Sequence, residues 1–365
     1  MKTISVDRIK LARESRGLTQ SSLAENLSFN QATLSKIEKG LYHISDEMVN
    51  ELATVLDYKK DFFYKNHEVY PLKHFYFRKN LGTTVTNSKK IESLINIFSS
   101  NIIDLTESVN IEIDLPYTDL EDEGLTPESF AQRVRDYFNL PKGPVKNLVN
   151  VLEKKGVVIH FFDFNKDLKI SGVSFVTPEG IPLIIINNSI PNSRKRFTIA
   201  HELGHLLMHY KGNIIGELRD VEKEADKFAS EFLVPTKEIR SELFNLTEEK
   251  LFALKSYWKV SIQAIIYKSS TINAITKDQH RRWITKINYL GWRLHEPFEF
   301  EIESPNLLPK LFTLHFEELD YSVEEIQEIF GLQENEFFKY YVQNYPQLHK
   351  YVKNLNRSKI NLKLI

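Results

Sequence analysis

The spacing of apolar residues changes along this chain. Up to about residue 64, apolar positions recur every three or four residues in short blocks, which predicts three short helices. The first ends at Gly17, a turn at 28–30 joins the second to the third, and Gly40 ends the third. Between residues 157 and 186 the apolar runs are short, β-branched and aromatic, and Asn, Asp, Pro and Gly separate them, which predicts an antiparallel sheet. Helical spacing returns after Pro191 and continues into the last sixty residues.

These changes of pattern divide the chain into five expected segments. A helical domain at 1–64 precedes a connector at 65–125, which contains an amphipathic helix at 87–107 and an acidic, Pro-containing joint. The remaining segments are a mixed helix-and-strand domain at 126–240, a helical extension at 241–300 and a helical C-terminal region at 301–365. The sequence therefore predicts an α+β chain of several domains.

The helix expected after Pro191 carries the sequence H-E-x-x-H. His201 and His205 are four residues apart, so their imidazoles lie on one helical face and can bind a single ion. Zinc held by two imidazoles and one further ligand retains a position for water, whose proton a neighbouring carboxylate can accept. We therefore expect His201 and His205 to bind Zn²⁺ and Glu202 to act as the general base.

The third ligand is expected from the following helix, residues 220–233. Its apolar stripe includes Glu224 at helical spacing, whereas Glu222 lies off the stripe. A buried carboxylate is rare unless it is paired, so Glu224 is either joined to a basic partner or bound to the metal, and we favour the metal. His209, on the same helix as the pair, is the less favoured alternative.

Two stretches of this region carry a family resemblance. They read Arg196-Phe-Thr-Ile-Ala-His-Glu-Leu-Gly-His-Leu-Leu and Glu224-Ala-Asp-Lys-Phe-Ala-Ser-Glu-Phe-Leu-Val-Pro235. Together they resemble the zinc metallo-endopeptidases of the ImmA/IrrE family, over roughly residues 126–300. The resemblance implies a zincin-like metallopeptidase domain, a small antiparallel sheet plus helices, with Zn²⁺ on His201, His205 and Glu224 and with Glu202 as base.

The N-terminal helices carry a second resemblance. The stretch Leu18-Thr-Gln-Ser-Ser-Leu-Ala-Glu-Asn-Leu, followed by Leu34-Ser-Lys-Ile-Glu-Lys-Gly40, resembles the Cro/repressor (XRE) type of helix-turn-helix. The resemblance implies operator DNA as partner and a homodimer, because one recognition helix reads only a half-site. A protein-binding helical module is the alternative, since basic residues barely outnumber acidic ones here. The residues expected to contact DNA are Gln20, at a phosphate, and Gln31, Ala32, Thr33 and Lys36, at base edges or backbone.

The last strand before the metal helix is the expected substrate site. Pro182 favours an edge strand, and in zincins the strand before the metal helix commonly pairs with extended substrate. We therefore expect the substrate backbone to lie along Leu183, Ile184, Ile185, Ile186 and Asn187.

The composition limits the partners, the cellular compartment and the metal ligands that we expect. The net charge of −1 and the 42% of hydrophobic residues by themselves point to no membrane or nucleic-acid partner, and no apolar run is long enough for a membrane span. The chain has no cysteine, which fits a reducing cytoplasm and leaves zinc to His and carboxylate ligands.

Together these features predict a transcriptional regulator whose zinc-dependent endopeptidase cleaves a partner protein, expected to be a helix-turn-helix repressor. The repressor-like domain in the same chain leaves open whether the substrate is another repressor or this protein itself. The alternative is a non-proteolytic DNA-binding regulator, or an antitoxin-like protein, that uses the zinc fold for sensing or stability.

Overall fold

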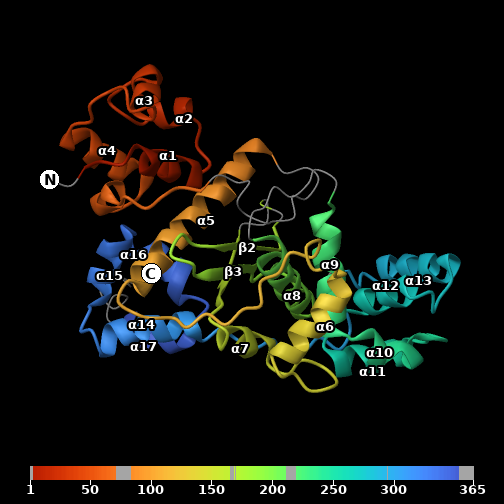
Figure 1. Ribbon diagram of the computed structural model, residues 1–365. Helices are drawn as coiled ribbons and strands as arrows, with labels where there is room; N and C mark the ends of the chain where they lie inside the picture. Colours follow the sequence, from red (N-terminus) through yellow and green to blue (C-terminus); the bar gives the residue numbers. More distant parts are fainter. Residues whose placement is uncertain are drawn as a thin grey trace, which may run out of the picture.

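A computed structural model describes residues 3–70, 84–164, 168, 170–210, 219–293 and 295–352. Helices dominate this α+β structure, and a three-stranded sheet lies at its centre (Figure 1). The helix-turn-helix domain and the C-terminal helices lie on one side of the sheet, and the helices within residues 127–137 and 221–289 lie on the other. Within these ranges no helix is both long and apolar enough to cross a bilayer.

The N-terminal domain contains the three predicted helices and a fourth. Gly17 and Gly40 follow the first and third helices with φ of 72° and 68°, a left-handed conformation that glycine adopts without strain. The side chains of Thr19 and Asn30 accept hydrogen bonds from the first turns of the second and third helices. The helices are α1 (Val6–Ser15), α2 (Gln20–Ala24), α3 (Gln31–Ile37) and α4 (Asp46–Leu56).

The central sheet is mixed, so the prediction of an antiparallel sheet is wrong in part. Its strands are β1 (Val158–Phe162), β2 (Gly172–Val176) and β3 (Pro182–Asn187), in the order β1-β3-β2. β3 pairs antiparallel with β2 and parallel with β1. All three strands are almost completely buried because helices cover both faces, and such strands show no polar alternation from which pairing could be read.

One face of the sheet packs against the metal helix. Ile184 and Ile186 point into a core shared with helices α8 (Asn192–His209) and α9 (Val221–Leu233). Gly204 lets these two helices approach closely, because a Cβ there would lie 3.1 Å from the Phe228 ring and 3.4 Å from Ala225 Cα. The same side of the molecule holds α6 (Pro127–Tyr137), α7 (Leu148–Glu153), α10 (Thr236–Ile239), α11 (Glu248–Trp258), α12 (Ile262–Thr271) and α13 (Lys277–Tyr289).

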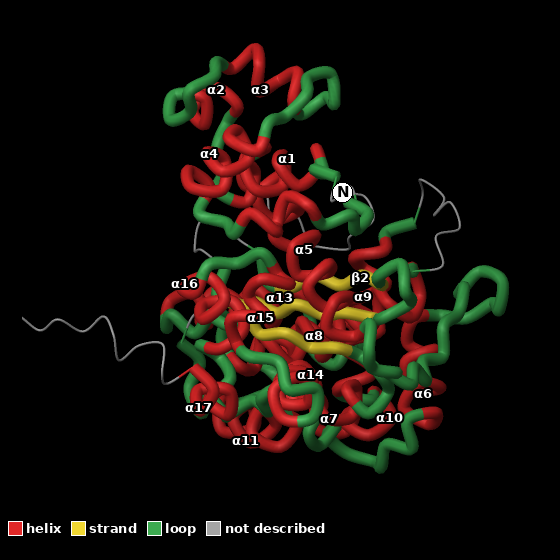
Figure 2. Tube along the Cα trace, turned by 90° about the vertical axis from the view of Figure 1, so that its left-hand side faces the viewer, coloured by secondary structure: helices red, strands yellow, loops and turns green. Residues whose placement is uncertain are grey.

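The other face of the sheet packs against the long helix α5 (Val85–Thr106) and the C-terminal helices (Figure 2). Phe98 of α5 lies 4.7 Å from Phe162 of β1 and 5.5 Å from Tyr340, between ring centroids. The first part of α5 packs along α1. The C-terminal helices are α14 (Leu307–Glu317), α15 (Val323–Phe330), α16 (Glu334–Phe337) and α17 (His349–Val352), and residues 353–365 lie outside the described part.

One continuous apolar core therefore joins the helix-turn-helix domain, α5, this face of the sheet and the C-terminal helices. A β-bridge between Tyr58 and Leu332 adds a direct contact between the first domain and the C-terminal region. We call this assembly the junction: α1, the segment 58–67, α5, β1 and residues 307–352.

Candidate metal centre

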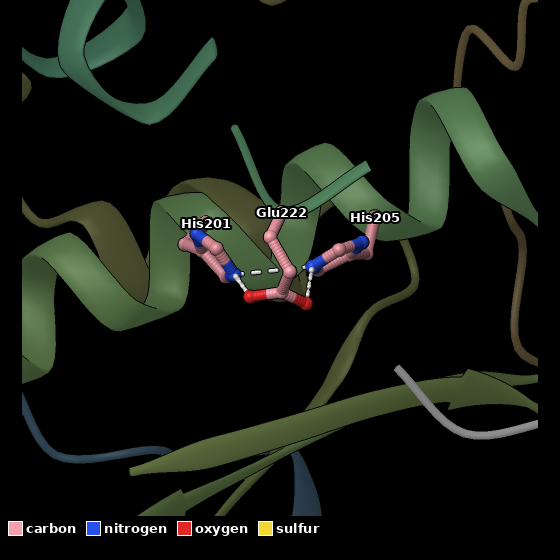
Figure 3. Close-up of side chains that lie close together, drawn as sticks. All are labelled: His201, His205 and Glu222. Atoms are coloured by element: carbon pink, nitrogen blue, oxygen red, sulfur yellow. Dashed lines mark hydrogen bonds and ion pairs between the residues drawn. The ribbon is translucent and has the colours of Figure 1, made fainter. Parts of the chain in front are cut away.

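Two histidines of α8 and one glutamate of α9 converge on a single point (Figure 3). The Nε2 atoms of His201 and His205 lie 3.0 Å apart. The carboxylate of Glu222 faces both, with Oε1 3.3 Å from His205 Nε2 and Oε2 3.6 Å from His201 Nε2. One atom from each residue lies within 4.8 Å of the others, as expected of three ligands around one ion.

Neighbouring side chains hold the two imidazoles in this orientation. His201 Nδ1 lies 2.9 Å from an Asp226 carboxylate oxygen, and His205 Nδ1 lies 3.0 Å from His209 Nδ1. Each hydrogen bond uses the ring nitrogen remote from the centre, so both Nε2 atoms remain directed inward. Within the described residues the buried Oε2 of Glu222 has no hydrogen-bond partner.

The pKa values of the three groups reflect burial together with close opposite charges. Burial lowers the pKa of His201, but its hydrogen bond to Asp226 and the facing carboxylate of Glu222 outweigh burial and raise that pKa to about 10. Burial dominates at His205 and lowers its pKa to about 4. At Glu222 burial acts to raise the pKa, but the two imidazoles outweigh it and hold the pKa well below its usual range. The carboxylates thus create a negative environment that favours a cation.

Glu224, the predicted third ligand, is turned away from this point. Its Oε2 accepts hydrogen bonds from Arg219, at 2.8 Å, and pairs with His209 Nε2 at 3.0 Å. The structure therefore shows the basic partner that was the alternative for this buried acid, and brings Glu222 to the histidines instead. Both acids lie in the first turn of α9, but the two histidines face the side of the helix that carries Glu222, next to the apolar stripe and not within it.

Glu202 lies next to the centre and is 2% exposed. Its Oε2 accepts a 2.7 Å hydrogen bond from the hydroxyl of Ser174 in β2. Burial raises the pKa of Glu202 to about 7, so both of its protonation states are accessible near neutral pH. The absence of a side chain at Gly172 makes room, because a Cβ there would lie 3.2 Å from Glu202 Oε1. No short-range motif predicted either Ser174 or Gly172 as part of the site.

The predicted substrate strand is not an edge. β3 pairs with β1 through Leu183, Ile184, Ile185, Ile186 and Asn187, and with β2 on its other side. A peptide therefore has no free backbone edge on β3 to which it can add. Within the described residues β1 and β2 each pair on one side only, and of these two edge strands β2 carries Ser174 beside Glu202.

Polar side chains are exposed on the outer end of the helix-turn-helix domain. Gln31, Ala32 and Lys36 are exposed and Thr33 is half-buried, all on α3. The partly buried Gln20 of α2 accepts a 3.0 Å hydrogen bond from Gln31 and donates one of 2.8 Å to Glu38. These five residues, predicted to contact DNA, lie on or between the second and third helices.

Other buried groups fix the helices that carry the centre. Arg196 anchors α8 through hydrogen bonds to the carbonyls of Val145 and Lys259, and it pairs with Glu303 at 3.0 Å. Glu231 on α9 pairs with Lys268 of α12 at 2.8 Å, and both side chains are more than nine-tenths buried. The helical extension thus packs against the helix that supplies Glu222.

Two known protein families match parts of this chain, one in the N-terminal domain and one in the region of the metal centre. Residues 9–63 match a helix-turn-helix family, and residues 152–270 match a peptidase family described as the IrrE N-terminal-like domain. No curated protein matches the chain. The second match includes all three converging residues and Glu202, and the first includes the five residues predicted to contact DNA. The chain therefore joins an XRE-type helix-turn-helix domain to a peptidase-family domain of the IrrE/ImmA type.

Proposed function

We propose that this DNA-binding regulator is a zinc-dependent endopeptidase that cleaves a partner protein. The observation that carries the proposal is the convergence of His201, His205 and Glu222 beside the buried carboxylate of Glu202. Two imidazoles and one carboxylate, with a second carboxylate nearby as base, are the groups that zinc peptidases use. A purely structural zinc site has no need of such a base.

The residues present fit zinc. Two nitrogen ligands and one oxygen ligand suit this ion, and the chain offers no thiolate as an alternative. The buried Oε2 of Glu222 lacks a partner within the described ranges, and a cation beside it would satisfy it. When bound, zinc would act as a Lewis acid and lower the pKa of a water molecule to about 7.

The protein's own contribution is the handling of one proton. Ser174 occupies Oε2 of Glu202, so Oε1 is the oxygen that accepts a proton from the attacking water. Burial favours the neutral form of this carboxyl, so it can then return that proton to the leaving amine. Burial of the carboxylate also excludes solvent from this exchange.

We further propose a helix-turn-helix repressor as the substrate, because the family that this chain resembles cleaves such proteins. An extended segment of the substrate can add to the side of β2 that pairs with no strand among the described residues, next to Ser174. The DNA-reading form is proposed to be a homodimer, which light scattering of the full chain on DNA can test.

The decisive experiment compares the unmodified chain with Glu202→Gln in the presence of zinc and candidate repressors. We expect about one zinc per chain in both proteins, and cleavage of a repressor only by the unmodified chain. Glu179→Gln, an exposed glutamate at the β2–β3 turn, is the control and should cleave normally. Cleavage that survives in Glu202→Gln contradicts the role of that residue. Zinc binding without any cleavage by the unmodified chain would assign the site to sensing or stability.

A further inference from the structure

A cavity of about 560 Å³ opens where the helix-turn-helix domain meets the start of α5. Its wall comes from α1, α2, the two ends of α3 and the first turns of α5. The polar side chains that matter for the argument are Lys10, Gln20, Gln31, Lys39, Thr86 and Lys89.

The charge left facing this cavity is positive. Lys10, Lys39 and Lys89 are exposed, and within the described residues Lys10 and Lys39 form no ion pair. The acids in the wall, Glu14 and Glu38, are both paired with the buried Arg13, at 3.3 Å and 2.6 Å.

Lys89 is a special case because it belongs to α5, outside the helix-turn-helix match. It lies 3.5 Å from Glu14, and its side chain remains 52% exposed, so its ammonium group can turn toward the cavity. Only the lysine of this pair is exposed, because Glu14 is buried and also paired with Arg13, so the half-exposed ammonium group can exchange this shared partner for a stronger anionic one.

The cavity is continuous with the residues expected to read DNA. Gln31 opens α3, and its hydrogen bond to Gln20 joins the first turns of α2 and α3 at the rim. Amide side chains at such positions commonly bind phosphate oxygens and set the register of the protein on the duplex. A phosphodiester strand that meets Gln20 would therefore continue into a cavity lined by three lysines.

We propose that the start of α5 is part of the DNA interface, and that Lys10, Lys39 and Lys89 bind phosphates of one strand beside the bases that α3 reads. The proposal rests on DNA binding by the helix-turn-helix domain. It extends the interface beyond residues 9–63 and places one end of α5 on DNA, while Phe98 of the same helix packs against β1.

The test measures binding of the full chain to a random-sequence duplex of about 30 base pairs, by fluorescence anisotropy, between about 50 and 200 mM KCl. Non-specific DNA is the appropriate probe because phosphate contacts provide nearly all of its affinity. We expect Lys89→Gln to bind roughly fivefold more weakly and to reduce the slope of log K against log salt by about 1. Lys10→Gln and Lys39→Gln should act in the same way, and Lys89→Arg should retain the slope.

Lys154→Gln is the matched control, since Lys154 is an exposed lysine directly after α7. Circular dichroism of each variant checks that the fold is kept. If the unmodified chain binds duplex and Lys89→Gln has the slope of the control, α5 is not part of the interface and the inference fails alone. If the unmodified chain does not bind duplex, DNA binding itself fails with it.

Discussion

The charged side chains of the metal centre differ from Arg16 and Lys65, two buried or partly buried cations at the junction, in how completely their hydrogen bonds are satisfied. Directly after α1, at the edge of the junction, Arg16 donates to Glu336 at 2.8 Å and to the carbonyls of Leu56 and Asp57, so its donors point at defined acceptors. Lys65 is likewise buried against Asp104 and Asn101. At the centre, Glu202 has one side-chain hydrogen bond, from Ser174, and Oε2 of Glu222 has none within the described residues.

The difference separates two uses of buried charge. Charges whose hydrogen bonds are complete hold two elements together and have nothing left to offer a ligand. Charges whose hydrogen bonds are incomplete raise the free energy of the site, and this free energy falls when a cation or a proton binds. Changes in the first region should therefore alter stability, and changes in the second should alter zinc binding and turnover.

The largest expected effect is on zinc affinity, and it distinguishes Glu222 from Glu224 on α9. Glu222→Gln should weaken zinc binding more than about 100-fold, because a ligand is lost, whereas Glu224→Gln should weaken it about tenfold, as outer partners do. Competition with a chromophoric chelator measures both, and each variant is the other's control. The opposite order would restore Glu224 as the third ligand.

The next effect lies in the junction. Arg16→Met removes the cation that faces Glu336 and leaves that carboxylate only the hydrogen bond from Tyr340, so the free energy of unfolding should fall by about 2 to 3 kcal/mol while zinc affinity stays unchanged. Chemical denaturation, followed by fluorescence and by circular dichroism, measures the loss. Arg281→Gln is the control, because that side chain is 82% exposed on α13. A loss of zinc binding in Arg16→Met would show that the two regions are not independent.

A third effect concerns pH. His160 in β1 is fully buried, its Nδ1 lies 2.8 Å from the Tyr345 hydroxyl, and burial lowers its pKa to about 3. The unfolded chain, with an ordinary histidine pKa near 6.5, binds more protons below that pH, so stability falls as the pH drops from about 6.5 toward 3. At pH 5 this single group should cost about 2 kcal/mol.

His160→Phe fits the surrounding aromatic rings of Phe98, Phe162 and Tyr341 and should remove that part of the acid sensitivity. Unfolding free energies at pH 5 and pH 8 for both proteins provide the measurement. An unchanged difference between the two pH values would mean that other groups, mainly carboxylates, account for the acid response.

The smallest effect concerns the orientation of the base. Ser174→Ala should lower kcat about tenfold, a typical cost for losing a partner that orients a reactive group, with little change in KM. Ser171→Ala, a hydroxyl in the loop just before β2, serves as the control. A change in KM alone would indicate instead that Ser174 contacts the substrate.

The sequence predicted the parts of this protein whose information is local. Four-residue spacing placed His201 and His205 on one face, and Gly17, Gly40 and Thr19 marked helix ends that the structure confirms. The long helix expected at 87–107 forms as α5. These features depend on neighbours within a few turns of chain.

What the sequence did not predict depends on contacts between distant segments. The order of the strands, and thus the central place of β3, is not encoded in any single strand. The choice between Glu222 and Glu224 depends on where α9 crosses α8. One signal was present, since Glu222 and Asp226 repeat the four-residue spacing of His201 and His205, and both acids contact these histidines.

The burial of α5 bears on whether this protein can be its own substrate. Its first turns pack on α1, and its middle is enclosed by β1 and the C-terminal helices, so the repressor-like domain is held at a distance from His201, His205 and Glu222 of the same molecule. Reaching them would require the common core to open. Autoproteolysis, if it occurs, should therefore take place between two molecules, and its initial rate should rise with the square of the protein concentration.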